Sequence, residues 1–365
     1  MKLLYITNGI NAAGGLERVL SVKASYLADH YNYEVTILSL NGNDQHPFYR
    51  FSDKVKMLSI AVGGNLIQYI KSYRKGIKKT VKEVNPDIIS VCDDGLKGFL
   101  IPSKSGIKTP VIYERHVSKE IEMRQDFSWL KKIAIKAKWS LMEKLAANFS
   151  KFVVLTNGNL KEWRSLKNKV VIPNPLSFYP IEASTLKNRK VIAVGKQGFQ
   201  KGYDLLLCSW QLVQQQHPDW KLSIYGKIAP SAKLQEQADQ LKISQTVSFY
   251  PPEKAIESKY LESSVYVMSS RFEGFGMVLI EAMACGLPCV SFDCNYGPAD
   301  IIQNGVDGFL VANGDTAALA LRINDLIAHE ELRITLGKKA KENAKRFLPE
   351  IVVQQWDDLF KQLLP

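Results

Sequence analysis

The sequence predicts an α/β protein made of two doubly wound domains, each with a parallel β-sheet. Short apolar strands alternate with helices along the chain, a pattern typical of βαβ units whose sheet is covered on both faces. The alternation restarts after a proline-rich segment, 171-VIPNPLSFYPIE-182. A length of 365 residues also exceeds what one compact core usually holds, so about two domains are expected.

The first half of the chain begins with a short strand, a glycine-rich turn and a helical segment, 16-LERVLSVKASYLADHY-31. Strands are indicated by runs in which apolar and polar residues alternate, or in which all residues are apolar, when turn residues flank the run. We expect five strands here, at 2–8, 33–40, 86–93, 109–115 and 151–156. Longer helices are expected over 66–84 and 118–148.

The second half repeats this order. Strands are expected at 189–197, 220–226, 246–250 and 264–270. Helices are expected over 203–216, over 277–285, and at the end of the chain over 349–364, where Pro349 suits the first helical turn. We take 173–187 as the linker, with domains over 1–175 and 176–348.

Composition narrows the class of protein. With 46% hydrophobic and 23% charged residues, the chain has the balance of an ordinary globular protein. It has no run of 18 apolar residues, and its first strand reaches a turn too early for a signal peptide, so a cytoplasmic location is expected. Its five cysteines form no CxxC pair and no zinc-type spacing, which favours buried reduced thiols.

The net charge of +12 is concentrated in the first half. Residues 1–170 contain 28 Lys and Arg against 15 Asp and Glu, whereas residues 171–365 contain 20 against 21. This asymmetry suggests that the two domains have different tasks and that the first one faces an anionic partner.

The segment 269-SSRFEGFGMVLIEAMACG-286 carries the strongest candidate site. It follows an expected strand, and Gly274 and Gly276 remove side chains where the backbone turns into a helix. A helix N-terminus attracts phosphate, and carboxylates beside it, Glu273 and Glu281, accept hydrogen bonds from sugar or ribose hydroxyls. The alternative is an ordinary helix start with acidic residues that suit the helix dipole.

A second candidate is the turn in 194-VGKQGFQKGYDLLL-207. Lys196 and Lys201 lie around glycines in a connection from strand to helix, where two ammonium groups can reach one anion. The alternative is a solvated surface loop.

Two further positions follow strands of the first domain. Gly14 and Gly15, in 8-NGINAAGGLERV-19, would allow a ligand to approach the backbone closely, although the segment lacks the GxGxxG pattern and could be an ordinary turn. His116 follows the strand at 109–115, where a histidine is either a ligand contact or a structural hydrogen-bonding group.

Several motifs are absent from the sequence. There is no D-x-D, HExxH, GxSxG or Walker motif. The negative charge on a bound diphosphate would therefore be neutralised by Lys196, Lys201 and the helix N-terminus. Such electrostatic stabilisation needs no metal ion. No metal ion or other cofactor is expected.

With these segments in place, the chain resembles the family 4 retaining glycosyltransferases over nearly its full length. The motifs that carry the resemblance are GGLERV, VIPNP, VGKQGFQKGYD, EGFGMVLIEAMACGLPCVSFD and GPADIIQNGVDGFLV. The resemblance implies the GT-B architecture, in which two Rossmann-like domains face each other across a cleft. It also implies that the terminal helix, 349–365, packs back on the first domain.

The resemblance also implies a role for each site residue. Glu273 would bind donor-sugar hydroxyls and Glu281 the ribose, while Lys196 and Lys201 would neutralise the diphosphate. His116 would contact the sugar near the reacting carbon. The other implied donor contacts are Gly14, Gly15, Gly274, Phe275, Gly276, Met277 and Val278. Lysine at 196 departs from the arginine of many relatives and lacks its bidentate fork.

The implied reaction is transfer of a sugar from a nucleoside-diphosphate sugar with retention of configuration. A UDP-hexose or UDP-N-acetylhexosamine is favoured as donor, with GDP-mannose as the alternative. The acceptor would be a saccharide, free or on a polyprenyl diphosphate, in cell-surface polysaccharide synthesis. The basic segments 66–84 and 129–145 would bind the anionic inner face of the cytoplasmic membrane, or else form solvated outer helix faces.

Three other functions remain open at this point. An epimerase of the same fold would need acid and base residues and no basic acceptor surface. A nucleic-acid-binding protein would explain the charge, but no recognition motif is present, so no nucleic-acid partner is expected. A non-catalytic sugar-nucleotide sensor would bind the donor without transfer.

Overall fold

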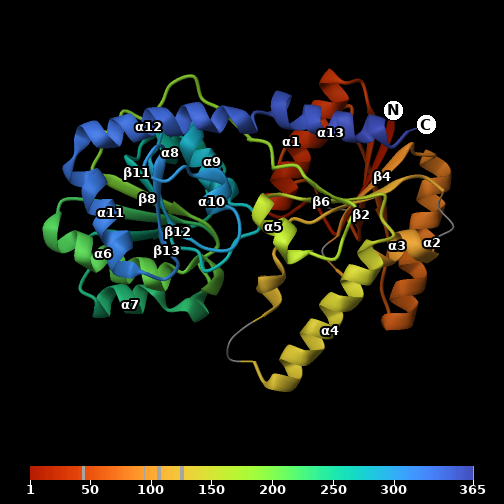
Figure 1. The fold of residues 1–365 in the computed structure, drawn as a ribbon, viewed down its shortest axis with the longest axis horizontal. Helices are drawn as coiled ribbons and strands as arrows, with labels where there is room; N and C mark the ends of the chain where they lie inside the picture. Colours follow the sequence, from red (N-terminus) through yellow and green to blue (C-terminus); the bar gives the residue numbers. More distant parts are fainter. Residues whose placement is uncertain (43–45, 94, 105–107, 124–126, 365) are drawn as a thin grey trace. The chain divides into compact units, whose positions relative to one another are not determined.

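The computed structural model describes residues 1–42, 46–93, 95–104, 108–123 and 127–364. The chain divides into two compact units (Figure 1). Unit 1 comprises Met1–Ser177 with Pro349–Pro365, and unit 2 comprises Phe178–Leu348. Our sequence-based boundary fell between 175 and 176. Each unit is an α/β domain with a parallel sheet, as the sequence predicted.

Unit 1 contains a seven-stranded sheet in the order β3-β2-β1-β4-β5-β6-β7, with every neighbouring pair parallel. Its central strands are buried on both faces, which parallel sheets between helices require. The strands are β1 (Lys2–Thr7), β2 (Glu34–Leu40), β3 (Lys56–Ile60), β4 (Ile88–Cys92), β5 (Val111–Glu114), β6 (Lys151–Val154) and β7 (Lys169–Val171).

Helices cover both faces of this sheet. The alternation along β1 shows the two faces, because Leu3 and Tyr5 belong to one buried cluster whereas Leu4 and Ile6 belong to another. The first cluster includes α1 and the C-terminal helix α13, which lie against each other (Figure 1). The helical elements are α1 (Gly15–His30), α2 (Leu66–Val84), η1 (Gly98–Leu100), α3 (Ile101–Lys104), η2 (Lys119–Glu122), α4 (Trp129–Ala146), α5 (Asn157–Glu162) and α13 (Pro349–Gln362).

Unit 2 contains a six-stranded parallel sheet in the order β10-β9-β8-β11-β12-β13. Its strands are β8 (Lys190–Val194), β9 (Lys221–Tyr225), β10 (Val247–Tyr250), β11 (Val265–Met268), β12 (Cys289–Asp293) and β13 (Gly308–Ala312). Its helical elements are η3 (Phe199–Lys201), α6 (Tyr203–Gln216), η4 (Pro230–Ala232), α7 (Leu234–Gln240), α8 (Ile256–Leu261), α9 (Met277–Ala284), α10 (Pro298–Ile301), α11 (Thr316–Ala328), α12 (Glu330–Ala344) and η5 (Lys345–Phe347).

Both sheets reverse their strand order at one place. In unit 1 the chain moves outward from β1 to β3 and then returns to place β4 beside β1; in unit 2 it returns to place β11 beside β8. Ligands of open α/β sheets bind outside the carboxyl ends of the strands at such a reversal. The turns after β8 and β11 therefore form the candidate site of unit 2, and those after β1 and β4 mark the corresponding place in unit 1.

Two sequence predictions of secondary structure were wrong in part. The expected helix over 118–148 is instead the short η2 and the later α4, with 124–126 outside the described residues. Strands β3, β7, β12 and β13 were not predicted. Strands β3 and β7 have only a weak sequence pattern, because they occupy the two edges of their sheet and contain no fully buried residue.

Candidate functional site

The two turns at the strand reversal of unit 2 are joined by an ion pair. Lys201, at the end of η3, donates from Nζ to Oε1 of Glu273 at 2.7 Å. Ser270 Oγ donates to the same carboxylate oxygen at 2.5 Å. The Glu273 side chain is 7% exposed and that of Lys201 is 15% exposed, so the pair is only slightly exposed to solvent.

Glycine at 195 allows the lysine to reach this position. Gly195 has φ +153°, and a Cβ there would lie 2.6 Å from Lys201 Cε. The lysine side chain thus crosses directly over a residue without a side chain. The backbone of Glu273 is fixed as well, since its N–H donates to the Asn295 carbonyl at 2.8 Å.

A second ion pair connects the same two turns, and it was not predicted from the sequence. Arg271 donates from its two terminal nitrogens to the two carboxylate oxygens of Asp204, at 2.8 and 2.6 Å. Burial opposes ionisation of Asp204, but Arg271 still lowers the pKa of this carboxyl below its usual value. The sequence signal was that both residues lie within the two predicted candidate segments, 194–207 and 269–286, since a bidentate pair between distant segments leaves no spacing pattern.

The N-terminus of α9 lies directly after Glu273. Gly276 caps this helix with φ +106° and no side-chain hydrogen bond, and Met277 and Val278 form its first turn. N–H groups in a first helical turn have no intrahelical acceptor and carry a partial positive charge. Gly274 is half-buried, whereas Phe275 is buried against Phe347 and forms part of the core. This turn therefore supplies backbone donors for an anion.

Glu281 occupies a different environment from Glu273. Its side chain is 0% exposed, on the second turn of α9, and Tyr260 Oη lies 3.5 Å from its Oε2. In this structure the carboxylate is therefore not accessible to a ribose unless the groups that cover it move.

The other predicted lysine of the turn, Lys196, is exposed. The residue after it, Gln197, is buried and anchors the turn, because its backbone N–H donates to the Lys227 carbonyl at 2.9 Å. Its side-chain amide also donates to the carbonyls of Gly226 and Tyr250, both at 3.3 Å. The backbone of Lys196 is thus fixed while its side chain is available.

In unit 1, Gly14 and Gly15 form the start of α1, after β1. Gly14 is the N-cap residue in extended conformation, and a Cβ on it would meet only the flexible Glu17 side chain. Gly15 is exposed, and a Cβ there would have no atom within 4 Å. No steric contact among the described residues therefore requires a glycine at position 15.

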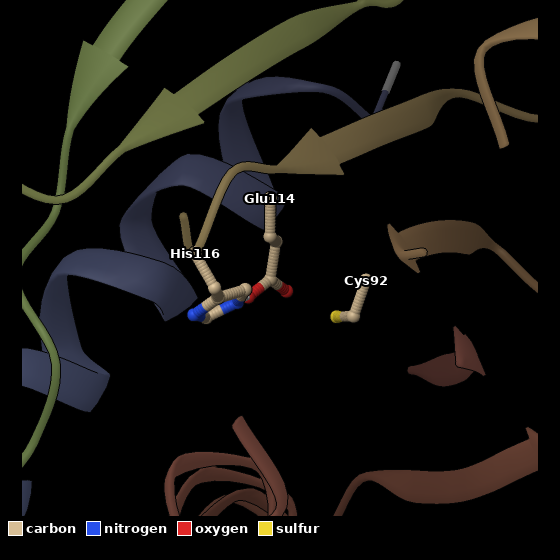
Figure 2. A group of neighbouring side chains, drawn as sticks. All are labelled: Cys92, Glu114 and His116. Carbon is tan, nitrogen blue, oxygen red and sulfur yellow. Dashed lines mark hydrogen bonds and ion pairs between the residues drawn. The ribbon is translucent and has the colours of Figure 1, made fainter. Parts of the chain in front are cut away.

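His116 follows β5 and contacts a buried carboxylate (Figure 2). Its Nε2 lies 3.1 Å from Oε2 of Glu114, and the same oxygen pairs with Lys23 of α1. Burial would raise the pKa of Glu114, but Lys23 and His116 together lower it to about 2. Because Glu114 is ionised, we assign the proton of His116 to Nε2. Its buried Nδ1 then has no partner among the described residues and can accept a hydrogen bond.

Cys92 is the third side chain in Figure 2. Cys92, Glu114 and His116 each offer one atom that can bind a metal ion. These three atoms lie within 4.8 Å of one another, as in a metal-binding site. The Lys23 ammonium, however, already neutralises Glu114, and it also lies 3.9 Å from the centroid of the Trp356 ring. A metal cation next to this buried ammonium would be repelled. We therefore assign the cluster to the positioning of His116.

The predicted site residues thus lie in two sets. Gly14, Gly15 and His116 belong to unit 1, at the carboxyl ends of β1 and β5, and the other predicted residues belong to unit 2. In unit 2 a cation, a carboxylate and a helix N-terminus are adjacent at a strand reversal, an arrangement that suits a ligand with phosphates and hydroxyls.

Comparison with known proteins agrees with this geometry. The profile of the family described as "Glycosyl transferases group 1" matches residues 180–343. The amylovoran biosynthesis glycosyltransferase AmsD of Erwinia amylovora is 32% identical over 98% of this chain and 99% of its own length. The chain is a group 1 glycosyltransferase. This is the family 4 relationship that the sequence motifs predicted.

Two further proteins resemble this glycosyltransferase at lower sequence identity. A Campylobacter jejuni protein, named GalNAc-alpha-(1->4)-GalNAc-alpha-(1->3)-diNAcBac-PP-undecaprenol alpha-1,4-N-acetyl-D-galactosaminyltransferase, is 24% identical over 100% of this chain and 99% of its own. A variant of Staphylococcus aureus TarM, solved with Fondaparinux, alpha-GlcNAc-glycerol and UDP, aligns with a TM-score of 0.81 at 16% identity, over 98% of this chain and 99% of its own. At this identity the likeness shows the GT-B fold.

Proposed function

We propose that this glycosyltransferase moves a sugar from a nucleoside-diphosphate sugar to a lipid-linked or oligosaccharide acceptor, with retention of configuration, in cell-surface polysaccharide synthesis. The Lys201–Glu273 pair beside the N-terminus of α9 carries the proposal. It joins a phosphate-binding cation to a hydroxyl-binding carboxylate at the place where α/β sheets bind ligands. The name of the AmsD relative supports the polysaccharide role.

The donor is proposed to bind in unit 2. Backbone N–H groups of Met277 and Val278 would hold the distal phosphate, with Lys196 and Lys201 neutralising the diphosphate. Glu273 would hold sugar hydroxyls, and Glu281 the ribose after local rearrangement. We favour UDP as the nucleotide, which the UDP complex of TarM supports; GDP-mannose is the alternative.

The chemical step would form a bond from an acceptor hydroxyl oxygen to the anomeric carbon. The bond from that carbon to the diphosphate oxygen breaks, and the hydroxyl proton passes to the leaving phosphate. Lys196, Lys201 and the α9 N-terminus would stabilise the charge that develops on the diphosphate. His116, held by Glu114, would accept a hydrogen bond from a sugar hydroxyl at its buried Nδ1 after local rearrangement. We propose no metal ion or other cofactor for this step.

Release of nucleoside diphosphate tests the proposal. The protein is incubated with a panel of UDP- and GDP-sugars, with and without saccharide acceptors on a polyprenyl diphosphate. We expect acceptor-dependent release, and an anomeric coupling in the NMR spectrum of the product that matches the donor. Inverted product would rule out retention. Conversion of the donor without an acceptor would favour an epimerase.

We further propose that unit 1 binds the anionic inner face of the cytoplasmic membrane peripherally. No helix among the described residues is long and apolar enough to span a bilayer. Helix α4 extends away from the rest of unit 1 in Figure 1, and its only buried residues are Met142 and Ala146. Near its start Trp129, Leu130 and Ile133 are 69, 61 and 54% exposed, among lysines. Exposed aromatic and aliphatic side chains next to lysines suit an interfacial helix.

A further inference from the structure

Unit 1 contains an apolar pocket that the site described above does not include. It has a volume of about 330 Å³ and lies between α2 and the segment that follows β4. Helix α2 supplies Leu66, Ile70 and Ile77 to its lining, and the segment after β4 supplies Leu96 and Leu100. The volume is at the lower end of the range for small-molecule sites.

The position of the pocket connects it with the strand reversal of unit 1. Asn8 after β1 donates to Oδ1 of Asp93 after β4, at 3.1 Å. Lys97 of the pocket donates to Oδ1 of Asn8 at 2.7 Å, and Tyr73 donates to Oδ2 of Asp93 at 3.2 Å. The pocket wall is therefore hydrogen-bonded to the carboxyl ends of β1 and β4, where doubly wound sheets bind ligands.

The surface around the pocket is strongly basic. Lys97, Arg74 and Lys78 are among its lining residues. The remaining cations of α2 are exposed lysines, and the helix contains one acidic residue, Glu83. These lysines are Lys71, Lys75, Lys79 and Lys82. An apolar pocket with a basic surround suits an amphiphile that has a hydrocarbon chain and an anionic head group.

We propose that this pocket binds the first isoprene units of a polyprenyl diphosphate that carries the acceptor saccharide. The inference rests on the proposed function, because it identifies the lipid part of the acceptor. The chain would enter between Ile70 and Leu96, and the cations of α2 would face the diphosphate. The saccharide attached to the diphosphate would then lie at the edge of the sheet that carries Gly15 and His116.

Binding of farnesyl diphosphate to the full-length protein tests the inference. Calorimetry is performed with saturating UDP, so that the diphosphate cannot occupy the donor site. We expect farnesyl diphosphate to bind at least about tenfold more tightly than inorganic pyrophosphate, because pyrophosphate lacks the buried chain. Equal affinities would overturn the proposal. Equally tight binding of dihexanoylphosphatidylglycerol would also overturn it, because it would indicate a general membrane-lipid site.

Matched variants on one helix locate the binding site. I70W fills the pocket and should lower the affinity for farnesyl diphosphate about tenfold or more. I67W places the same side chain on α2 at a residue that is 79% exposed and does not line the pocket, so its affinity should be unchanged. L96W fills the pocket from the opposite wall and replaces I70W if that variant unfolds. Wild-type affinity in a folded I70W or L96W would overturn the proposal.

The two proposals can fail separately. A protein that binds UDP and transfers sugar, but does not prefer farnesyl diphosphate to pyrophosphate, contradicts only the pocket. A protein that binds farnesyl diphosphate in the predicted manner, but releases no nucleotide from any donor, contradicts the transferase function instead.

Discussion

Lys201 Nζ lies 2.7 Å from Oε1 of Glu273, and this contact joins two turns that are 72 residues apart in the sequence. In the structure, the cation proposed for the donor phosphates pairs with the carboxylate proposed for the donor sugar. A bound donor would offer both groups new partners: phosphate oxygens for the lysine and hydroxyls for the glutamate. The pair holds both side chains at the strand reversal.

Replacing Glu273 tests its role on the sugar side. E273Q keeps the shape but loses the charge, and we expect kcat to fall about 100-fold with little change in UDP affinity, because the lost contact is to the transferring sugar. The measurement is steady-state release of UDP alongside calorimetric titration of UDP. The matched control is E253Q, since Glu253 lies on the loop after β10, where it accepts a hydrogen bond from the N–H of Ala255. Unchanged turnover in E273Q would contradict the assignment.

Glu281 is expected to affect nucleotide binding more than turnover. E281A should weaken UDP binding about tenfold or more, through loss of a charge-assisted hydrogen bond to the ribose. Because the residue is fully buried, the thermal midpoint is measured in parallel, and E281Q serves as the isosteric variant. If E281A and E281Q bind UDP as the wild type does, the carboxylate is structural and the ribose contact is wrong.

Two glycines in the lysine turn provide a matched pair for stability. Gly202 has φ +60°, and a Cβ there would lie 2.1 Å from the Ser269 carbonyl oxygen. G202A should therefore lower the free energy of unfolding by about 2 kcal/mol or more and also impair donor binding. G198A has an extended backbone and no atom within 4 Å of the new Cβ, so its stability should be within about 0.5 kcal/mol of wild type. Urea unfolding of both variants checks this order.

The buried Lys23–Glu114 pair predicts loss of stability in acid. The pKa of Glu114 is lowered from 4.5 to about 2 in the folded protein, so its contribution is fully present above pH 4.5 and is lost as the pH falls toward 2. At about 1.4 kcal/mol per pKa unit, this amounts to roughly 3 kcal/mol.

The control for this prediction removes both charges. E114Q alone leaves the Lys23 ammonium buried without its carboxylate and should destabilise the fold by about 3–5 kcal/mol. The double variant K23M/E114Q should recover much of this stability and lose the part of the acid dependence between pH 4.5 and 2. An unchanged acid profile in the double variant would mean that other carboxyls determine it.

Helix α4 predicts membrane binding that depends on both apolar and charged side chains. The triple variant W129A/L130A/I133A should lower co-sedimentation with anionic liposomes about tenfold or more, since each buried apolar side chain contributes about 1.5–3 kcal/mol. L321A, at an exposed leucine of unit 2, is the matched control. Binding should weaken with rising salt. Absence of binding by the wild type at low salt would contradict the membrane proposal.

The sequence by itself determined the helices and strands whose hydrophobic pattern is contained within a short segment. Alternating apolar strands and helices predicted two parallel-sheet domains, and glycines at strand-to-helix turns marked the places where a backbone can meet a ligand. The segments around Glu273 and Lys201 were recognisable because each follows its own strand by a few residues. The reason is physical: a turn's conformation is encoded by the residues within it.

Only the tertiary structure decided which of these residues meet. Parallel pairing of β8 with β11 brings Lys201 to Glu273 and Arg271 to Asp204, and neither pair has a spacing that a sequence pattern could show. The burial of Glu281 and the apolar pocket beside α2 are likewise results of packing between distant segments. Such contacts depend on strand order and helix placement, which are set by the hydrophobic core as a whole.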